Sequence, residues 1–247
     1  MNPANPTYPT IRTAGYNGFL VSFAATLSEP ANRAAIAFRA ALERENWAAV
    51  EETSTSLVST YLRFDPLGCD HPEMSRKLQS LLETTDWFAA PLPAGRRLWH
   101  VPTVYGTDLA PQLEDAAALA GITPQQAIAS ISKSRLRVQT IGFAPGQPYL
   151  GELPAEWDIP RQTTLTPQVP EGALTVAIRQ VVLFSVPSPT GWRHVGQTGL
   201  RLFQPDTDDP FTLRQGDEVI FDAVTRAEFE NMQANAPHAG ATCEPLP

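Results

Sequence analysis

The sequence is poor in the residues that build metal clusters and disulfide frameworks. Its 247 residues include two cysteines, Cys69 and Cys243, and four histidines. The cysteines lie far apart and neither belongs to a C-x-x-C pair, which excludes the usual zinc and redox motifs. No H-E-x-x-H motif is present. We therefore expect no metal site, and free thiols in a reducing compartment.

The chain also lacks long apolar runs and basic clusters. No run approaches the roughly 20 apolar residues that cross a bilayer. Residues 1–18 show neither the charged start nor the apolar stretch of a signal peptide. The formal net charge is -8, whereas a nucleic-acid surface needs clustered Lys and Arg. From these absences we expect a cytoplasmic protein that binds neither membranes nor nucleic acid.

Familiar catalytic motifs are missing as well. There is no G-x-S-x-G elbow and no Gly-Lys-Ser/Thr phosphate loop. Asp108, Glu114 and Asp115 stand near the start of a predicted helix, where the helix dipole explains them better than acid–base chemistry. His100 and His194 lie in predicted strands, where core packing or a satisfied hydrogen bond is expected. The catalytic residues stay unassigned, and we expect no cofactor on this chain.

Proline is abundant instead, with 24 residues, and this favours a structure rich in β-strands and turns. The first half alternates between strand and helix patterns. Strands are predicted at residues 18–24 and 56–66, with helices that begin after Ser28 and Asp70. Another strand follows residue 95. This order matches a ferredoxin-like α+β unit, which we expect to form a small domain over residues 1–95.

The second half predicts two helices and then a series of short strands. Gly121 ends the first helix, and Thr123 caps the second. After Leu136, strands alternate with Gly and Pro turns, as in a closed barrel or sandwich. We therefore expect a mainly β-barrel domain over residues 96–230. Residues 231–247 are small, polar and Pro-rich, and are predicted to form a disordered tail.

The unusual segment is GFAPGQPYLGELP, residues 142–154, which directly follows a predicted strand. Its glycines let the backbone turn sharply and approach a ligand, and its prolines stiffen the loop. Phe143 and Tyr149 could form the wall of a pocket. An ordered turn at the rim of a barrel explains the same composition equally well.

This segment resembles the G-F-x-P-G-F-x-Y-L-G-x-L-P signature of the family that includes the B subunit of 5-oxoprolinase, allophanate hydrolase subunit 1 and the kinase inhibitor KipI. We identify this family as the carboxyltransferase domain of subdomain A and B type. The similarity extends over roughly residues 15–230. It includes VPTVYG at residues 101–106, VPEG at 169–172, SPTGW at 188–192 and G-D-x-V-x-F at 216–221.

The resemblance implies a cyclophilin-like barrel for the second domain and a heteromeric assembly. Family members pair with a homologous second subunit, of the type of the 5-oxoprolinase C subunit or allophanate hydrolase subunit 2, and 5-oxoprolinase is completed by a third subunit. The implied activity is ATP-dependent opening of 5-oxoproline. ATP is then a cofactor at the level of the complex.

The sequence departs from the family pattern where chemical groups would be expected. Ile131 stands at the usual His position, Gln147 replaces an aromatic residue, and Ala173 replaces Ser. Both arginines of a P-R-x-R motif are missing, since residues 165–168 read LTPQ. Val182-Leu183-Phe184-Ser185 replaces a G-I-Y-P turn. The pattern predicts a preserved fold around an altered pocket.

Three functions remain open from the sequence. The chain is a divergent subunit of a 5-oxoprolinase-like or related allophanate or urea carboxyl-transfer enzyme, a non-catalytic regulator of the KipI type, or a member with a changed substrate. The last would use Gln147, Tyr149, Thr166 and Gln168 as neutral hydrogen-bonding groups. The residues predicted to bind substrate are Phe143, Pro145, Gly146, Gln147, Tyr149, Gly191 and Trp192.

Overall fold

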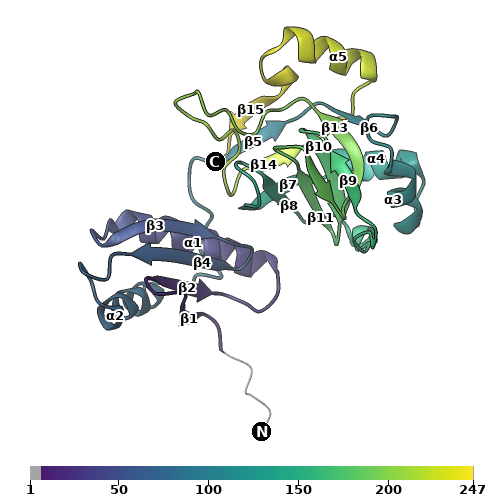
Figure 1. Ribbon diagram of the computed structural model, residues 1–247. Coiled ribbons are helices and arrows are strands. Elements are labelled where there is room, and N and C mark those ends of the chain that lie inside the picture. Colours follow the sequence, from purple (N-terminus) through teal and green to yellow (C-terminus); the bar gives the residue numbers. More distant parts are fainter. Residues whose placement is uncertain (1–6, 247) are drawn as a thin grey trace. The chain divides into compact units, whose positions relative to one another are not determined.

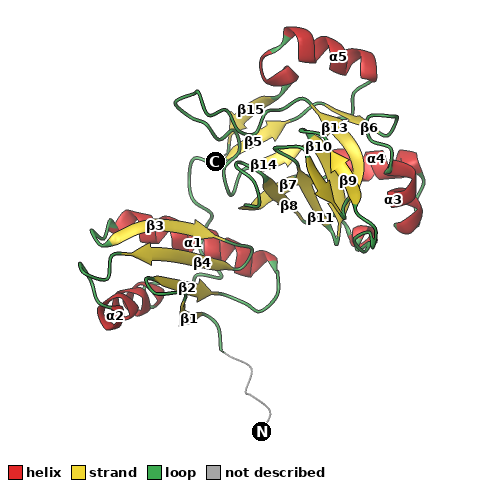
Figure 2. Cartoon of the chain, viewed as in Figure 1, coloured by secondary structure: helices red, strands yellow, loops and turns green. Residues whose placement is uncertain are grey.

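The computed structural model describes residues 7–246, which form two compact units that meet in sequence between Ala94 and Gly95 (Figure 1). The sequence predicts a domain boundary at residue 95. Residues 1–6 and residue 247, which belong to the predicted first domain and the predicted tail, lie outside the described part. Figure 2 shows that both units mix helices and strands.

The first unit is a four-stranded antiparallel sheet with two helices. Its strands are β1 (Thr10–Thr13), β2 (Gly18–Ser22), β3 (Val50–Thr55) and β4 (Ser59–Phe64), in the order β1-β2-β4-β3. Helices α1 (Glu29–Glu45) and α2 (His71–Leu82) contribute apolar side chains to one core with the inward residues of β2 and β4. Alternation along each strand sends every second side chain to that core.

The ends of both helices follow local sequence signals. The Ser28 side chain accepts a hydrogen bond from the backbone N–H of Ala31, and Asn46 ends α1 in the left-handed conformation. Asp70 accepts from the N–H of Glu73 at the start of α2. These caps satisfy donors and acceptors that a helix end leaves free, and both predicted helix starts are confirmed.

The predicted ferredoxin-like arrangement of the first domain is not confirmed. Its closing strand was expected after residue 95, but β5 (Arg97–His100) pairs with strands of the second unit. The fourth strand of the first unit is β1 instead, which lies beside β2 at the edge of the sheet. The sequence pattern did not reveal β1, a strand of four residues.

The second unit is built on a nine-stranded sheet in the order β15-β5-β14-β7-β8-β11-β10-β13-β6. Its strands are β5, β6 (Thr103–Tyr105), β7 (Leu136–Ile141), β8 (Pro148–Gly151), β10 (Ala173–Ala177), β11 (Gln180–Leu183), β13 (Arg193–Thr198), β14 (Glu218–Ile220) and β15 (Thr242–Pro245). Thr103 of β6, at the far edge, also bridges to Ala223 just after β14. The sheet is thus curled like part of a barrel.

The two faces of this sheet carry different side chains. Leu174 and Val176 of β10 belong to the main core of the unit, which also includes residues of α3 (Leu113–Leu119) and α4 (Pro124–Lys133). Ala173 and Ala177, which point to the other face, belong to a smaller cluster with Trp192. The short strands β9 (Thr166–Val169) and β12 (Ser188–Thr190) form a separate two-stranded sheet, and Val169 joins this smaller cluster.

The prediction of a disordered tail is wrong. Residues 226–235 form helix α5 (Arg226–Asn235), which begins with a capping box of Thr225 and Glu228 and buries Phe229. Strand β15 then pairs antiparallel with β5. The pairing adds a strand to an otherwise open sheet edge, which local composition cannot reveal.

Within residues 7–246, no helix is long and apolar enough to cross a membrane.

Candidate functional site

Residues 142–147 of the Gly/Pro segment form the loop of the β7–β8 hairpin, and residues 148–151 are strand β8. Ile141 pairs with Pro148, and the Gly142 N–H donates to the carbonyl oxygen of Gln147. Gly146 adopts a positive φ of 70°, and a Cβ there would stand 2.6 Å from the carbonyl oxygen of Leu202. Glycine is therefore required at this point of the loop. Phe143 also has a positive φ, of 73°, and its side chain is largely exposed.

The segment around Gly191 faces this loop across a hollow. Trp192 lies edge-to-face with Tyr149, with ring centroids 6.2 Å apart. The Trp192 N–H donates to the Thr190 hydroxyl oxygen, which fixes the turn after β12. The sequence folds this way because β8 and the 190–192 turn each contribute a large aromatic side chain to the smaller apolar cluster.

The hollow has a volume of about 340 Å³, near the lower limit of ligand pockets, which span roughly 300–1,000 Å³. Its walls are mainly aromatic and aliphatic. Eleven residues line it: Phe143, Gln147, Tyr149, Arg161, Leu165, Val182, Phe184, Pro189, Thr190, Gly191 and Trp192. None of these eleven is an acid, a histidine, a lysine, a serine or a cysteine.

The structure brings five of the seven predicted site residues to this hollow. Phe143, Gln147, Tyr149, Gly191 and Trp192 line it, from two segments far apart in the sequence. Pro145 is exposed and Gly146 is buried against Leu202, so neither lines it. Substrate binding by these residues stays a prediction.

Two polar groups in the lining have no partner within residues 7–246. Gln147 is almost fully buried, and its Oε1 atom has no hydrogen-bond partner there. Arg161 is exposed at the rim, and no acid pairs with it among the described residues. A Cβ on Gly191 would lie 3.6 Å from Arg161 Nε, so the guanidinium group lies close to the 190–192 turn.

The positions that depart from the family pattern fall in different places. Val182 and Phe184 line the hollow, whereas Ile131 is fully buried in the main core on α4. Thr166 does not line it, and its hydroxyl accepts hydrogen bonds from the amides of Gln112 and Gln162. Gln168 is exposed on β9. Of the four neutral groups proposed for a changed substrate, only Gln147 and Tyr149 lie at the hollow.

Two of the three acids near α3, Asp108 and Asp115, have structural partners. Asp108 forms an ion pair with Arg226, and this contact holds the pKa of its carboxyl group below the usual value. Asp115 pairs with the buried Arg193 at 2.5 Å. His100 Nδ1 is hydrogen-bonded to Asp222 Oδ2 at 2.9 Å, in agreement with the expected hydrogen bond.

His194 meets the other alternative of that expectation, core packing, because it is packed in the buried strand β13. Its Nε2 atom is buried without a hydrogen-bond partner in the described part of the chain. Burial lowers the pKa of its imidazole, while contacts with the Gly196 backbone and the Gln197 side chain oppose the shift. In the sheet, His194 lies opposite Thr175, which in turn lies opposite Val182 of the hollow. His194 itself does not line the hollow.

The described part of the chain holds no group of three or more His, Cys, Asp or Glu side chains that could bind a metal ion. Cys69 is buried, and Cys243 is exposed on β15; both are free thiols.

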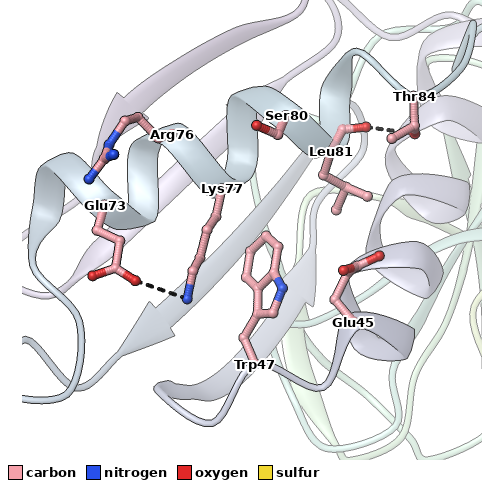
Figure 3. A pocket seen from close by; sticks show the side chains of 8 residues that line it. All are labelled: Glu45, Trp47, Glu73, Arg76, Lys77, Ser80, Leu81 and Thr84. Carbon is pink, nitrogen blue, oxygen red and sulfur yellow. Dashed lines mark hydrogen bonds and ion pairs between the residues drawn. The ribbon is translucent and has the colours of Figure 1, made fainter.

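The first unit has hollows of about 460, 610 and 210 Å³. The first of these lies between the end of α1 and helix α2 (Figure 3). Lys77 pairs there with Glu73 at 3.2 Å and lies 5.8 Å from the centre of the Trp47 ring. None of the three hollows is lined by a buried polar side-chain atom that lacks a partner among residues 7–246. We therefore place the candidate site in the second unit.

Comparison with known proteins identifies the class. A model of the family described as carboxyltransferase domain, subdomain C and D, matches residues 9–213. The match spans most of the chain, and the chain belongs to this family. The subdomain letters A and B expected from the sequence are corrected to C and D.

Characterised relatives share one name. The B subunit of 5-oxoprolinase from Bacillus subtilis (strain 168) is 27% identical over 227 residues, which cover 89% of this chain and 94% of the relative. The B subunit of 5-oxoprolinase from Escherichia coli O157:H7 is 37% identical over 125 residues, or 51% of this chain and 57% of the relative. The resemblance to this family seen in the sequence is confirmed.

Solved structures show the same fold. The crystal structure of TTHA0988 matches with a TM-score of 0.72 and 29% identity over 87% of this chain and 40% of that one. This chain therefore spans less than half of that protein. The urea amidolyase of K. lactis matches with a TM-score of 0.73 over 99% of this chain and 17% of that one, at 14% identity, which shows the fold alone.

Sequence reasoning missed Arg161 as a lining residue. Arg161 lies in the segment between η1 (Ala155–Trp157) and β9, where no periodic pattern marks its position. The local signal was a single cation in a stretch of turn residues, which does not reveal that the chain returns to the 190–192 turn.

Proposed function

We propose that this chain is a subunit of a heteromeric enzyme of the 5-oxoprolinase type, that it contributes a ligand-binding hollow, and that it is not active alone. The similarity to the B subunit of 5-oxoprolinase, which covers almost the whole length of one relative, supports an activity of the 5-oxoprolinase type. The word subunit in that name supports an assembly with other chains. The partner we expect is a homologous second subunit, of the type of the 5-oxoprolinase C subunit, with a third subunit for full activity.

One observation supports the proposal that this chain binds a ligand but is not active alone. The eleven residues that line the hollow include one cation, Arg161, and no histidine, acid, lysine, serine or cysteine. The two hydroxyl groups of the lining are those of Tyr149 and Thr190, and the Thr190 hydroxyl already accepts a hydrogen bond from the Trp192 N–H. Arg161 and Gln147 can hold a polar ligand, whereas a histidine or carboxylate for proton transfer would have to come from elsewhere. The partner subunits are the natural source of that group. Any ATP would be used by the complex and need not bind to this chain.

The same proposal includes a finer description of the fold and location. The curled sheet of the second unit, with its second small sheet, fits a cyclophilin-like barrel, and the chain composition fits a cytoplasmic protein. The altered residues Val182 and Phe184 in the lining fit a divergent pocket.

A regulatory protein of the KipI type is the second candidate. The observation that favours it is that the eleven lining residues include no histidine, acid or lysine. Such a protein would bind a partner without any change in a small molecule.

Co-expression with the homologous second subunit tests these alternatives. The complex would be purified by size exclusion, the third subunit added, and ATP-dependent release of glutamate from 5-oxoproline measured. A stable complex with glutamate release supports the enzyme subunit. A stable complex without release indicates a changed substrate. A chain that stays alone and inert contradicts the enzyme subunit and leaves the regulator as the better proposal.

A further inference from the structure

The cation at the rim of the hollow lies in an acidic protein. The chain has a net charge of -8, and several arginines of the second unit have acidic partners. Arg97, for example, pairs with Asp217, and Arg193 pairs with Asp115. Arg161 has no such partner among the described residues, although acids are in excess. Its guanidinium group is therefore available for the anion of a ligand, and a carboxylate suits its planar pair of donors.

The buried amide of Gln147 supplies a second polar contact. A buried side-chain oxygen without a hydrogen-bond partner is unfavourable, because it has lost its hydrogen bonds to water. Gln147 Oε1 is such an atom, in a residue that lines the hollow and is 1% exposed. Rotation about its last side-chain bond exchanges oxygen and nitrogen, so the amide can offer an acceptor or a donor. An amide group in a ligand can pair with it in either orientation.

The remaining walls favour a hydrocarbon group of some size. Four aromatic side chains line the hollow, those of Phe143, Tyr149, Phe184 and Trp192, together with Leu165 and Val182. The T-shaped pair of Tyr149 and Trp192 leaves ring faces and edges of the kind that pack against another ring. The volume of about 340 Å³ exceeds the need of a single five-membered ring.

We propose that the hollow binds an N-acylated amino acid with an aromatic or large branched side chain. In this assignment Arg161 binds the carboxylate, the Gln147 amide pairs with the amide of the ligand, and the aromatic walls enclose the side chain. The proposal rests on the proposed function in that it places a ligand in the same hollow. It goes further by naming an occupant larger and more apolar than 5-oxoproline.

Binding to the purified chain tests the proposal without any partner subunit. Isothermal titration calorimetry would compare N-acetylphenylalanine with 5-oxoproline and with two matched probes. N-acetylphenethylamine lacks only the carboxylate, and O-acetylphenyllactate replaces the amide N–H by an ester oxygen. We expect N-acetylphenylalanine to bind at least tenfold more tightly than each of the other three.

Variants assign each contact to its residue. Arg161→Gln should remove the preference for N-acetylphenylalanine over N-acetylphenethylamine, and Gln147→Met should remove its preference over O-acetylphenyllactate. Arg201→Gln and Gln233→Met, which change an exposed Arg and an exposed Gln away from the hollow, should leave all affinities unchanged. Thermal melts followed by circular dichroism would show that every variant is folded.

The outcomes separate this inference from the proposed function. Tighter binding of 5-oxoproline than of N-acetylphenylalanine, or equal binding of the acid and the probe without carboxylate, overturns the assignment. A stable complex with glutamate release, together with no binding of N-acetylphenylalanine, leaves the subunit proposal intact and rejects the inference. Selective binding by a chain that forms no complex supports the inference and rejects the subunit proposal.

Discussion

At the scale of single residues, Gly146 carries the tightest constraint in the loop that walls the hollow. Its φ of 70° is unfavourable for other residues, and an added Cβ would meet the Leu202 carbonyl oxygen at 2.6 Å. A β-branched side chain combines both penalties. We expect Gly146→Val to lower the free energy of unfolding by more than about 2 kcal/mol, as measured by urea denaturation.

Gly142 offers a matched control in the same loop. A Cβ at Gly142 would meet no atom within 4 Å, and its φ is not positive. Gly142→Ala should therefore change stability by less than about 0.5 kcal/mol. Equal stability of the two variants would contradict the role assigned to Gly146.

His194 predicts a dependence of stability on pH. Burial lowers the pKa of its imidazole in the folded chain, whereas the unfolded chain has a value of about 6.5. Between these two values the unfolded state binds more protons, so stability falls as the pH drops below about 6.5 and levels off below the folded pKa. Urea denaturation between about pH 5 and 8 should show a steeper loss for the wild type than for His194→Gln. Identical slopes would show that the imidazole titrates alike in both states.

Residue-level signals predicted helix ends well and the site only in part. Ser28, Asp70 and Thr123 cap helices as expected, because a cap depends on residues within one turn. Phe143 and Trp192 were also placed correctly at one hollow, through the family motif. Arg161 was not found, because its place in the hollow depends on the path of the chain between distant strands.

At the scale of elements, the last strand shows the limit of local composition. Residues 231–247 are small and polar, and nothing within them requires a strand. Strand β15 exists because β5 offers a free edge about 140 residues earlier, with Thr242 opposite His100 and Pro245 opposite Arg97. The closing strand of the first unit was misassigned for a related reason. The sequence pattern of residues 97–100 shows that they form a strand, β5, but it does not show to which sheet β5 belongs.

Removal of β15 should destabilise the second unit. Deletion of residues 242–247 would expose the backbone edge of β5 and the neighbourhood of Trp99, which lies opposite Cys243. We expect the melting temperature to fall by several degrees, and the shortened chain to aggregate more readily because a sheet edge is open. Glu244→Ala, which keeps the strand and changes one exposed side chain, should melt within about a degree of the wild type. A truncated chain with unchanged melting and solubility would show that β15 contributes nothing to the sheet.

At the scale of the whole molecule, the two units have separate cores. The apolar cluster of the first unit draws on residues between Phe19 and Trp87, and the main cluster of the second draws on residues between Trp99 and Ala241. The two sets of residues do not overlap. The sequence indicated this division through the Pro-rich segment near residue 95, and the comparisons show that the fold recurs within longer chains such as TTHA0988. The order of strands in each sheet needed the structure, since it depends on pairings between distant segments.

Separate cores predict that the units fold separately. No sheet and no buried cluster is shared between the units among the described residues, and the hollow is lined by residues between 143 and 192 of the second unit. We expect a fragment of residues 95–247 to unfold cooperatively in a thermal melt and to bind N-acetylphenylalanine with the affinity of the full chain. A fragment of residues 1–94 should also show a cooperative transition, and it should not bind this probe. If residues 95–247 were unfolded by circular dichroism, the stability of the second unit would depend on the first, and the two cores could not be treated as independent.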